Sequence, residues 1–356
     1  MEIGLIGLPR VGKTTVYNAL TGSSATTGGY ASSDTPNISA VKVPDERIDA
    51  LVEMFSPKKT AHAALTFIDV VGLEKDTGRR ERSDAAFDAV RTVDALALVV
   101  RGFESDATPD PMNDVIDTSS EIILSDLERV ENRMERLEKQ ISKINRAELS
   151  VELDLLKKCR DCLNDEKFLS ELDLDKNEQT LLRGFQLLSL KPMLVILNLP
   201  EDELEKKVEE LFLDFSTWAD ERKIPLVPIC GILEEEISKL DKDEAKLFLK
   251  EMGIDEAGLN RMIIAAYDLL ELISFFTVGE DEVKAWTISQ GTHARLAAGE
   301  IHSDIEKGFI KAEVVSYDDL IACGSLGKVK TAGKSRLEGK EYIVKDGDII
   351  NFRFNV

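Results

Sequence analysis

Eight residues near the amino end constrain the fold of this chain more than any other feature. Gly7–Thr14 reads G-L-P-R-V-G-K-T and matches the pattern G-x-x-x-x-G-K-[ST]. An apolar run, Ile3–Ile6, precedes it, and a helical pattern over Thr15–Leu20 follows. A loop between a strand and a helix turns its backbone N–H groups toward an anion, and the helix dipole adds to that attraction. The segment predicts a P-loop that holds the phosphates of a nucleotide.

Each position of the loop has a chemical reason. The ammonium group of Lys13 is expected to reach the β- and γ-phosphate oxygens, and the hydroxyl of Thr14 to bind Mg²⁺. Glycine lets the backbone approach the phosphates closely. The residues expected to contact nucleotide here are Pro9, Arg10, Val11, Gly12, Lys13, Thr14 and Thr15.

A second segment, residues 64–72, reads A-L-T-F-I-D-V-V-G. An apolar strand that ends in Asp69 would place this carboxylate where it holds Mg²⁺ through water. Gly72 can donate its N–H to the γ-phosphate, which completes a D-x-x-G sensor. We therefore expect Asp69 to be a metal-binding residue, and Gly72 to act in catalysis together with Lys13.

A third segment, Asn198-Leu199-Pro200-Glu201, follows another apolar run. GTPases carry N-K-x-D at such a strand end, where the Asp binds the guanine N1–H and exocyclic amine. Glu201 is longer than Asp, and Leu199 replaces the Lys, so guanine would lose partners at a cost of about 1–3 kcal/mol. Pro200 and Glu201 also suit the first turn of a helix. The other wall of the base pocket is expected at Cys230, Gly231 and Ile232.

Short apolar runs at the spacing of an α/β protein predict a doubly wound, mostly parallel sheet. The expected strands are Ile3–Ile6, Ala64–Ile68, Ala95–Val100, Met193–Leu197 and Pro225–Ile229. No apolar run reaches the ~18 residues of a membrane span, and no secretory signal begins the chain. A cytoplasmic location without membrane attachment is the resulting expectation.

Residues 119–190 lack strand signals and carry a heptad seam instead. The seam predicts an antiparallel helical hairpin inserted into the sheet domain, with two ordinary surface helices as the alternative. Cys159 and Cys162, two of only four cysteines, lie three residues apart and are interpreted as a packing pair. The seam residues are Ile123, Leu127, Val130, Met134, Leu137, Ile141 and Ile144, followed by Leu149, Leu153, Leu156 and Leu163.

Composition changes again near residue 274, after a helix expected over Gly258–Ile273. Short alternating runs predict a small β-rich domain. The expected domains are residues 1–118 with 191–274 for the nucleotide-binding domain, 119–190 for the hairpin and 275–356 for the β-rich domain. The strands of the β-rich domain are expected at Phe275–Val278, Val283–Ile288, Gly308–Val315, Glu341–Val344 and Ile349–Phe354.

The net charge of −22 repels nucleic acid from the chain as a whole, so an RNA contact requires a local basic patch and DNA binding is not expected. Five cations lie within residues 328–340, where only Glu338 opposes them. This cluster predicts an RNA contact, and a solvated loop is an equal alternative. Its members are Lys328, Lys330, Lys334, Arg336 and Lys340.

Together these segments resemble the YchF family, also called Obg-like ATPases, over nearly the whole chain. The resemblance lies in Gly7–Thr14, in D-x-x-G-L at Asp69–Leu73, and in N-x-x-E at Asn198–Glu201. It is closest near the carboxyl end, in Ala298–His302 and Asp346–Val356. That region resembles the ubiquitin-like TGS domain of the family.

The resemblance implies a translation-associated switch that prefers ATP over GTP and uses Mg²⁺. It implies the ribosome as partner, on the large subunit, the small subunit or both, with RNA contacts through the TGS domain and the hairpin. We expect a monomer. A non-hydrolysing nucleotide-binding module and a GTP-specific GTPase are the alternatives.

Four departures from common patterns bear on mechanism. The family usually has Asn at Arg10, where related enzymes hold potassium, so we expect Arg10 to remove a potassium requirement. Residues 74–83 replace a glycine-rich stretch with an arginine-rich one. The first-switch Mg²⁺ ligand is expected at Ser33, with Thr35 as competitor. Leu73, a substitution that the family shares, cannot orient water, so intrinsic turnover should lie well below ~1 s⁻¹.

Overall fold

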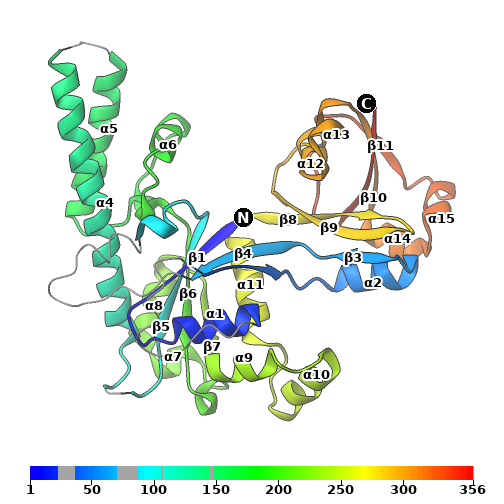
Figure 1. Ribbon diagram of the computed structural model, residues 1–356, viewed down its shortest axis with the longest axis horizontal. Helices are drawn as coiled ribbons and strands as arrows, with labels where there is room; N and C mark the ends of the chain where they lie inside the picture. The colour runs from blue at the N-terminus through cyan, green and yellow to red at the C-terminus, as the bar shows by residue number, and fades with distance from the viewer. Residues whose placement is uncertain (23–36, 70–86, 106, 144–146, 356) are drawn as a thin grey trace. The chain divides into compact units, whose positions relative to one another are not determined.

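The computed structural model describes residues 1–22, 37–69, 87–105, 107–143 and 147–355 (Figure 1). The chain divides into two compact units. The first contains Met1–Ser39 and Thr66–Met262, and the second contains Ala40–Leu65 and Ile263–Val356. Among the described residues, no helix combines the length and apolar character needed to cross a bilayer.

A six-stranded sheet organises the first unit, in the order β2-β4-β1-β5-β6-β7. The central strand β1 pairs in parallel with β4 and β5, and β5, β6 and β7 continue the parallel run. This arrangement confirms the predicted α/β sheet. The strands are β1 (Glu2–Ile6), β2 (Asn37–Lys42), β4 (Ala64–Asp69), β5 (Ala95–Arg101), β6 (Met193–Asn198) and β7 (Leu226–Ile229).

Helices surround this sheet and close its apolar core. Leu98, Val195 and Leu197 are buried in one cluster with Phe215 from a flanking helix. The helices are α1 (Lys13–Thr21), α7 (Val208–Leu211), α8 (Leu213–Glu221), α9 (Gly231–Ile237), α10 (Lys242–Glu251) and α11 (Gly258–Leu269). The prediction that α11 extends to Ile273 is wrong, because the helix ends at Leu269 and a strand begins at Leu272.

Two long helices form an arm that is inserted between β5 and β6, as predicted (Figure 1). The first begins at Pro111, a residue suited to the first turn of a helix, and the Asp110 side chain caps it by accepting from the Asn113 N–H. Ile144 of the expected seam lies outside the described residues. The arm consists of α4 (Pro111–Ile141), α5 (Ala147–Asn164), η1 (Leu169–Glu171), α6 (Lys176–Arg183) and η2 (Leu188–Leu190).

The arm has a hydrophobic core of its own. Val130, Met134 and Leu137 from α4 belong to one buried cluster with Leu156 and Cys159 from α5. Cys159 and Cys162 are both buried free thiols on α5, which agrees with the predicted packing pair. Burial raises the pKa of the Cys159 thiol to about 11, so this cysteine stays protonated and unreactive near neutral pH.

A buried ion pair joins the base of the arm to the sheet domain. The Arg91 guanidinium donates to the Asp126 carboxylate of α4 over 2.9 Å, and both side chains are buried. Asp126 also accepts from the backbone N–H of Leu188, at 3.1 Å, and of Ser189, at 2.8 Å. The Ser189 hydroxyl adds a further bond of 2.7 Å. These four hydrogen bonds compensate for the cost of burying the Asp126 carboxylate, and they fix η2 against α4.

The second unit contains a mixed sheet in the order β11-β10-β12-β8-β9-β3. Glu341–Val344 was predicted as a strand, and this is wrong, because only an isolated bridge joins Ile343 to His293. One edge strand of this sheet is β11, which lies within the basic cluster, and the other is β3. The elements are α2 (Glu46–Phe55), β3 (Lys59–Ala61), β8 (Leu272–Val278), β9 (Glu282–Ser289), α12 (Ala294–Ile301), α13 (Ser303–Lys307), β10 (Phe309–Ser316), α14 (Tyr317–Cys323), α15 (Leu326–Thr331), β11 (Arg336–Glu338) and β12 (Asp348–Phe354).

The basic cluster of residues 328–340 is not opposed by Glu338 alone, which corrects the expectation from sequence. Lys330 pairs with Glu313 at 2.9 Å, and Lys334 pairs with Asp319 at 2.6 Å. Arg336 lies 3.6 Å from Asp348. These acids come from β10, α14 and β12, so the sheet brings together charges that are separated in the sequence.

We predict that Asp126→Ala lowers the free energy of unfolding by about 3–5 kcal/mol, because it removes the buried charge partner of Arg91 and leaves it to the exposed Asp88, 3.3 Å from Nε. Chemical denaturation followed by circular dichroism measures this. Asp154→Ala is the matched control, since that carboxylate on α5 is 75% exposed and its ion pair is with the neighbouring Lys157. A loss below about 1 kcal/mol for Asp126→Ala would show that the pair does not anchor the arm.

Candidate nucleotide-binding site

The candidate site lies at the carboxyl ends of the parallel strands, where ligands bind in sheets of this type. Gly7 follows β1, Asp69 ends β4, Arg101 ends β5 and Asn198 ends β6. Register places Leu5 opposite Asp69, and Arg101 opposite Asn198. The sheet therefore brings three sequence-predicted segments to one edge.

The loop of residues 7–12 has no room for a side chain at its two glycine positions. A Cβ atom at Gly7 would lie 2.5 Å from the Val99 carbonyl oxygen. At Gly12, which has φ +89°, a Cβ atom would lie 2.2 Å from Asn198 Nδ2. Gly12 is also the N-cap residue of α1. The two glycines of the motif are therefore required by close packing and backbone conformation.

Lys13, at the start of α1, and Asp69, at the end of β4, form a buried ion pair beside this loop. Lys13 Nζ lies 3.5 Å from Asp69 Oδ1, and both side chains are less than 10% exposed. Burial lowers the pKa of Lys13, and the nearby Asp69 opposes that shift. Burial likewise raises the pKa of Asp69, against the influence of Lys13 and Asn37. The charge of each group thus offsets much of the cost of burying the charge of the other.

The donor set at this point fits Mg²⁺. Asp69 Oδ1 is buried and, apart from its 3.5 Å ion pair with Lys13, has no hydrogen-bond partner among the described residues, so it retains accepting capacity for a metal-bound water. The Thr14 hydroxyl, next to Lys13, is the second oxygen donor that the sequence predicts. Magnesium commonly uses one or two protein groups and completes its shell with water and phosphate. No cluster of three or more His, Cys, Asp or Glu side chains able to hold a metal occurs in the described residues, and such a cluster is not needed here.

Asn198 connects three segments of the site through one side chain. Its amide Nδ2 donates to the Val11 carbonyl over 3.0 Å, and its Oδ1 accepts from the Gly231 N–H at 2.9 Å. The side chain is buried, so both bonds are shielded from water. Asn198 therefore fixes the P-loop and the start of α9 relative to β6.

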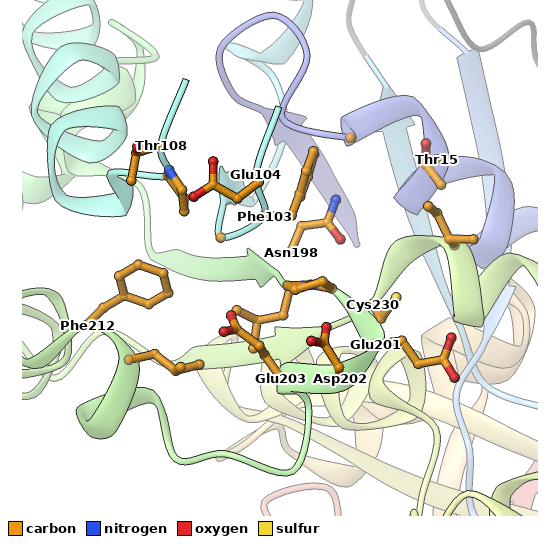
Figure 2. A pocket seen from close by; sticks show the side chains of 17 residues that line it. Thr15, Phe103, Glu104, Thr108, Asn198, Glu201, Asp202, Glu203, Phe212 and Cys230 are labelled. Carbon is orange, nitrogen blue, oxygen red and sulfur yellow. The ribbon is translucent and has the colours of Figure 1, made fainter. Parts of the chain in front are cut away.

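A cavity of about 760 Å³ opens beside the P-loop (Figure 2). Seven sequence-predicted residues line it: Gly12, Thr15, Asn198, Leu199, Glu201, Cys230 and Ile232. Leu199 is buried, whereas Glu201 is exposed and begins the 3-10 turn η3 (Glu201–Glu203). Glu201 thus lies in a helical first turn and on the cavity wall at once.

Several lining residues were missed by reasoning from sequence. Phe103 and Glu104 follow β5, and Figure 2 shows Phe103 beside Asn198 at the centre of the cavity. The signal that could have found them is their place after a buried parallel strand, since loops at that edge surround the ligand. The others are Gly102, Thr108, Pro109, Pro200, Asp202, Glu203, Leu211 and Phe212.

The remaining predicted residues fall into two groups. Pro9, Arg10 and Val11 belong to the P-loop, where Arg10 is exposed and has φ +67°, a value that non-glycine residues rarely adopt. Gly72, Leu73, Ser33, Thr35 and residues 74–83 lie outside the described residues. Their predicted roles stay predictions.

Comparisons with known proteins agree with this geometry. Residues 2–145 match a family model described as a 50S ribosome-binding GTPase. Residues 272–355 match the model named for the carboxyl-terminal part of the YchF GTPase and described as a protein of unknown function.

Full-length relatives extend the similarity to the whole chain. The ribosome-binding ATPase YchF of Bacillus subtilis is 40% identical, with 100% of both chains covered. The protein of the same name from Escherichia coli O157:H7 is 39% identical and covers 100% of this chain and 99% of its own length. The solved structure of the Schizosaccharomyces pombe YchF GTPase superposes with a TM-score of 0.87 at 31% identity. It covers 99% of this chain and 97% of its own.

We predict that Asn198→Asp weakens binding of Mg²⁺-ATP by about ten-fold or more. The carboxylate can still accept from Gly231 but cannot donate to Val11, and an unmade buried bond costs about 1–3 kcal/mol. Titration calorimetry measures the affinity. Asn177→Asp, on the exposed first turn of α6, is the control and should bind as the wild type does. Equal affinity of Asn198→Asp and wild type would mean that this amide does not shape the P-loop.

Proposed function

The chain belongs to the YchF family of P-loop nucleoside triphosphatases, and on that premise we propose that it binds ATP with Mg²⁺, hydrolyses it slowly and acts as a switch on the ribosome. The observation that carries the proposal is the buried ion pair between Lys13, which follows the P-loop glycine Gly12, and Asp69 at the end of β4. A buried cation next to a carboxylate oxygen without a hydrogen bond is an arrangement that a metal-bound triphosphate completes.

Binding would rearrange the partners of Lys13. A triphosphate offers the ammonium group several anionic oxygens, so Lys13 can exchange part of its interaction with Asp69 for the phosphates. Asp69 then becomes available to a metal-bound water, and Thr14 to the metal itself. When bound, Mg²⁺ supplies charge neutralisation at the phosphate oxygens. The residues of the P-loop orient the phosphates and restrict their motion.

The base pocket supports a preference for ATP over GTP. Glu201 stands where a guanine-reading site has Asp, and it begins an exposed 3-10 turn. Leu199 stands where such a site has Lys, and its side chain is buried. The N1–H and exocyclic amine of guanine would lack acceptors against this wall. Adenine has no N1–H and therefore does not need a carboxylate at this place.

The switch itself would depend on contacts to the γ-phosphate. We propose that the Gly72 N–H and the Ser33 hydroxyl make them, and that hydrolysis releases both segments. Leu73 follows Gly72 and cannot orient water, so we propose that a partner completes the catalytic arrangement. The curated relatives are named ribosome-binding, which makes the ribosome that partner in our proposal.

Ribosome contact is proposed through the helical arm and the carboxyl-terminal domain, in a cytoplasmic monomer. The ion pairs of Lys330, Lys334 and Arg336 with Glu313, Asp319 and Asp348 reduce the positive field of the basic cluster. An RNA contact here would therefore have to compete with these intramolecular pairs.

We predict that the purified chain hydrolyses ATP below ~1 s⁻¹ and binds ATP more tightly than GTP. Phosphate release and competition between the two nucleotides, with and without ribosomes, measure both. Lys13→Ala should abolish phosphate release, and Lys139→Ala, on an exposed part of α4, should not. Release that persists in Lys13→Ala at the wild-type rate would mean that this site does not hydrolyse nucleotide. Tighter binding of GTP would contradict the assignment of the base pocket.

Arg10 generates a separate prediction about monovalent cations. We propose that its charge, in the loop position where the family usually has Asn, removes a need for potassium. Exchange of sodium for potassium should then change the ATPase rate less than about two-fold, and Arg10→Asn should restore a several-fold stimulation. Phosphate release in matched sodium and potassium buffers measures this. Strong potassium stimulation of the wild type would refute the role of Arg10.

A further inference from the structure

Arg101 is the last residue of β5, and its guanidinium group donates hydrogen bonds to the loop that follows the strand. Its Nη1 donates to the Phe103 carbonyl at 3.4 Å, to the Ala107 carbonyl at 2.8 Å and to the Ser105 hydroxyl. Its Nη2 reaches the Thr108 carbonyl at 3.5 Å. One guanidinium group therefore binds four acceptors within the next seven residues.

This loop forms one wall of the nucleotide cavity. Gly102, Phe103 and Glu104 line it from one end of the loop, and Thr108 and Pro109 from the other. The backbone contributes few bonds of its own: Gly102 N–H donates to the Asn198 carbonyl at 2.8 Å, and a long contact of 3.5 Å joins Ser105 to Ala107. The guanidinium is thus the main internal support of the described part of this wall.

The loop is also fixed where it joins the arm. The backbone N–H of Arg101 donates to Asp114 Oδ2 at 3.1 Å, and Asp114 lies in the first turn of α4. Burial raises the pKa of Asp114, while the Arg101 N–H and the Arg101 charge oppose that shift. Arg101 and Asp114 together hold both ends of the loop.

Phe103 is a side chain of this wall that lies close to the P-loop. Its ring reaches within 4.0 Å of the place where a Cβ atom of Gly12 would lie. Figure 2 shows it beside Asn198, between Glu104 and the P-loop side of the cavity. An aromatic ring at this point can cover a flat base, but only if its backbone is held in place.

We propose that Arg101 is a positioning residue for the base, and that it sets how tightly a purine is held without affecting the grip on the phosphates. The inference rests on the proposed function, because it requires that the P-loop binds a nucleoside triphosphate. Arg101 itself does not line the cavity, so it acts through the wall that it supports.

The test compares a ligand that has a base with one that lacks it. Calorimetry in Mg²⁺ buffer gives Kd for ATP and for inorganic tripolyphosphate, with wild type, Arg101→Met and Arg101→Lys. We expect Arg101→Met to weaken ATP binding about ten-fold and to change tripolyphosphate binding less than two-fold. Arg101→Lys should recover part of the loss, because one ammonium group replaces only some of the forked donors. Arg160→Met, at a half-buried position of α5 in the arm, is the control.

Other outcomes separate the inference from the function. An equal loss of both ligands in Arg101→Met, or no loss of either, overturns the positioning role. Wild type that binds ATP no better than tripolyphosphate overturns it also, since the base would then add nothing. Wild type that binds neither ligand defeats the proposed function instead.

A second variant keeps the test valid if Arg101→Met fails to fold. Ser105→Ala removes one acceptor of the guanidinium and leaves Arg101 in place. We expect a loss of about two- to five-fold for ATP alone, since a single bond at an exposed serine is worth little. Unchanged ATP affinity in Ser105→Ala, in a protein whose Arg101→Met variant is unfolded, would count against the proposal.

Discussion

The candidate site depends on a single buried amide. Asn198 donates to the P-loop at Val11 and accepts from Gly231 at the start of α9, so it fixes two walls of the cavity from one strand end. No charged residue could replace it without loss, because one of its partners is an acceptor and the other a donor. The closeness of Gly12 follows from the same contact, since no side chain fits between the loop and this amide. The phosphate cradle and the base pocket thus share one structural support.

Much of the site could be predicted from sequence because its chemistry is local. The P-loop, Asp69 and N-x-x-E are short motifs at strand ends, and parallel strands bring their carboxyl ends together. Phe103 carries no motif and could have been suggested only by its place after a parallel strand, and the role of Arg101 could not be found in this way. Their loop has no characteristic spacing, and the role of the guanidinium depends on carbonyl groups that only the folded loop directs toward it.

The fold shows the same division between local and non-local information. The arm and five of the six strands of the first sheet follow from their sequence patterns, and the structure confirms them; the edge strand β2 was not predicted. The basic cluster was read as nearly unopposed, yet Glu313 lies between Lys330 and Arg353 and has a pKa lowered by its hydrogen bonds to both. Likewise, residues 336–338 form an edge strand because β10 offers them a partner. Pairing across a sheet decides both features, and sequence spacing does not record it.

The second unit has a consequence for how a nucleotide signal can travel. Ala40–Leu65 belongs to this unit although it lies between the P-loop and Asp69 in sequence. Within the unit, β3 pairs in parallel with β9, and Arg47 bonds to Asp346 and covers the Phe276 ring at 5.2 Å. The chain therefore leaves the first unit along β2, a few residues after Ser33, and returns along the strand that ends in Asp69. Both crossings adjoin residues that we expect to follow the metal and the γ-phosphate. Two covalent connections of the second unit therefore start within a few residues of the segments that we expect to contact the metal and the γ-phosphate.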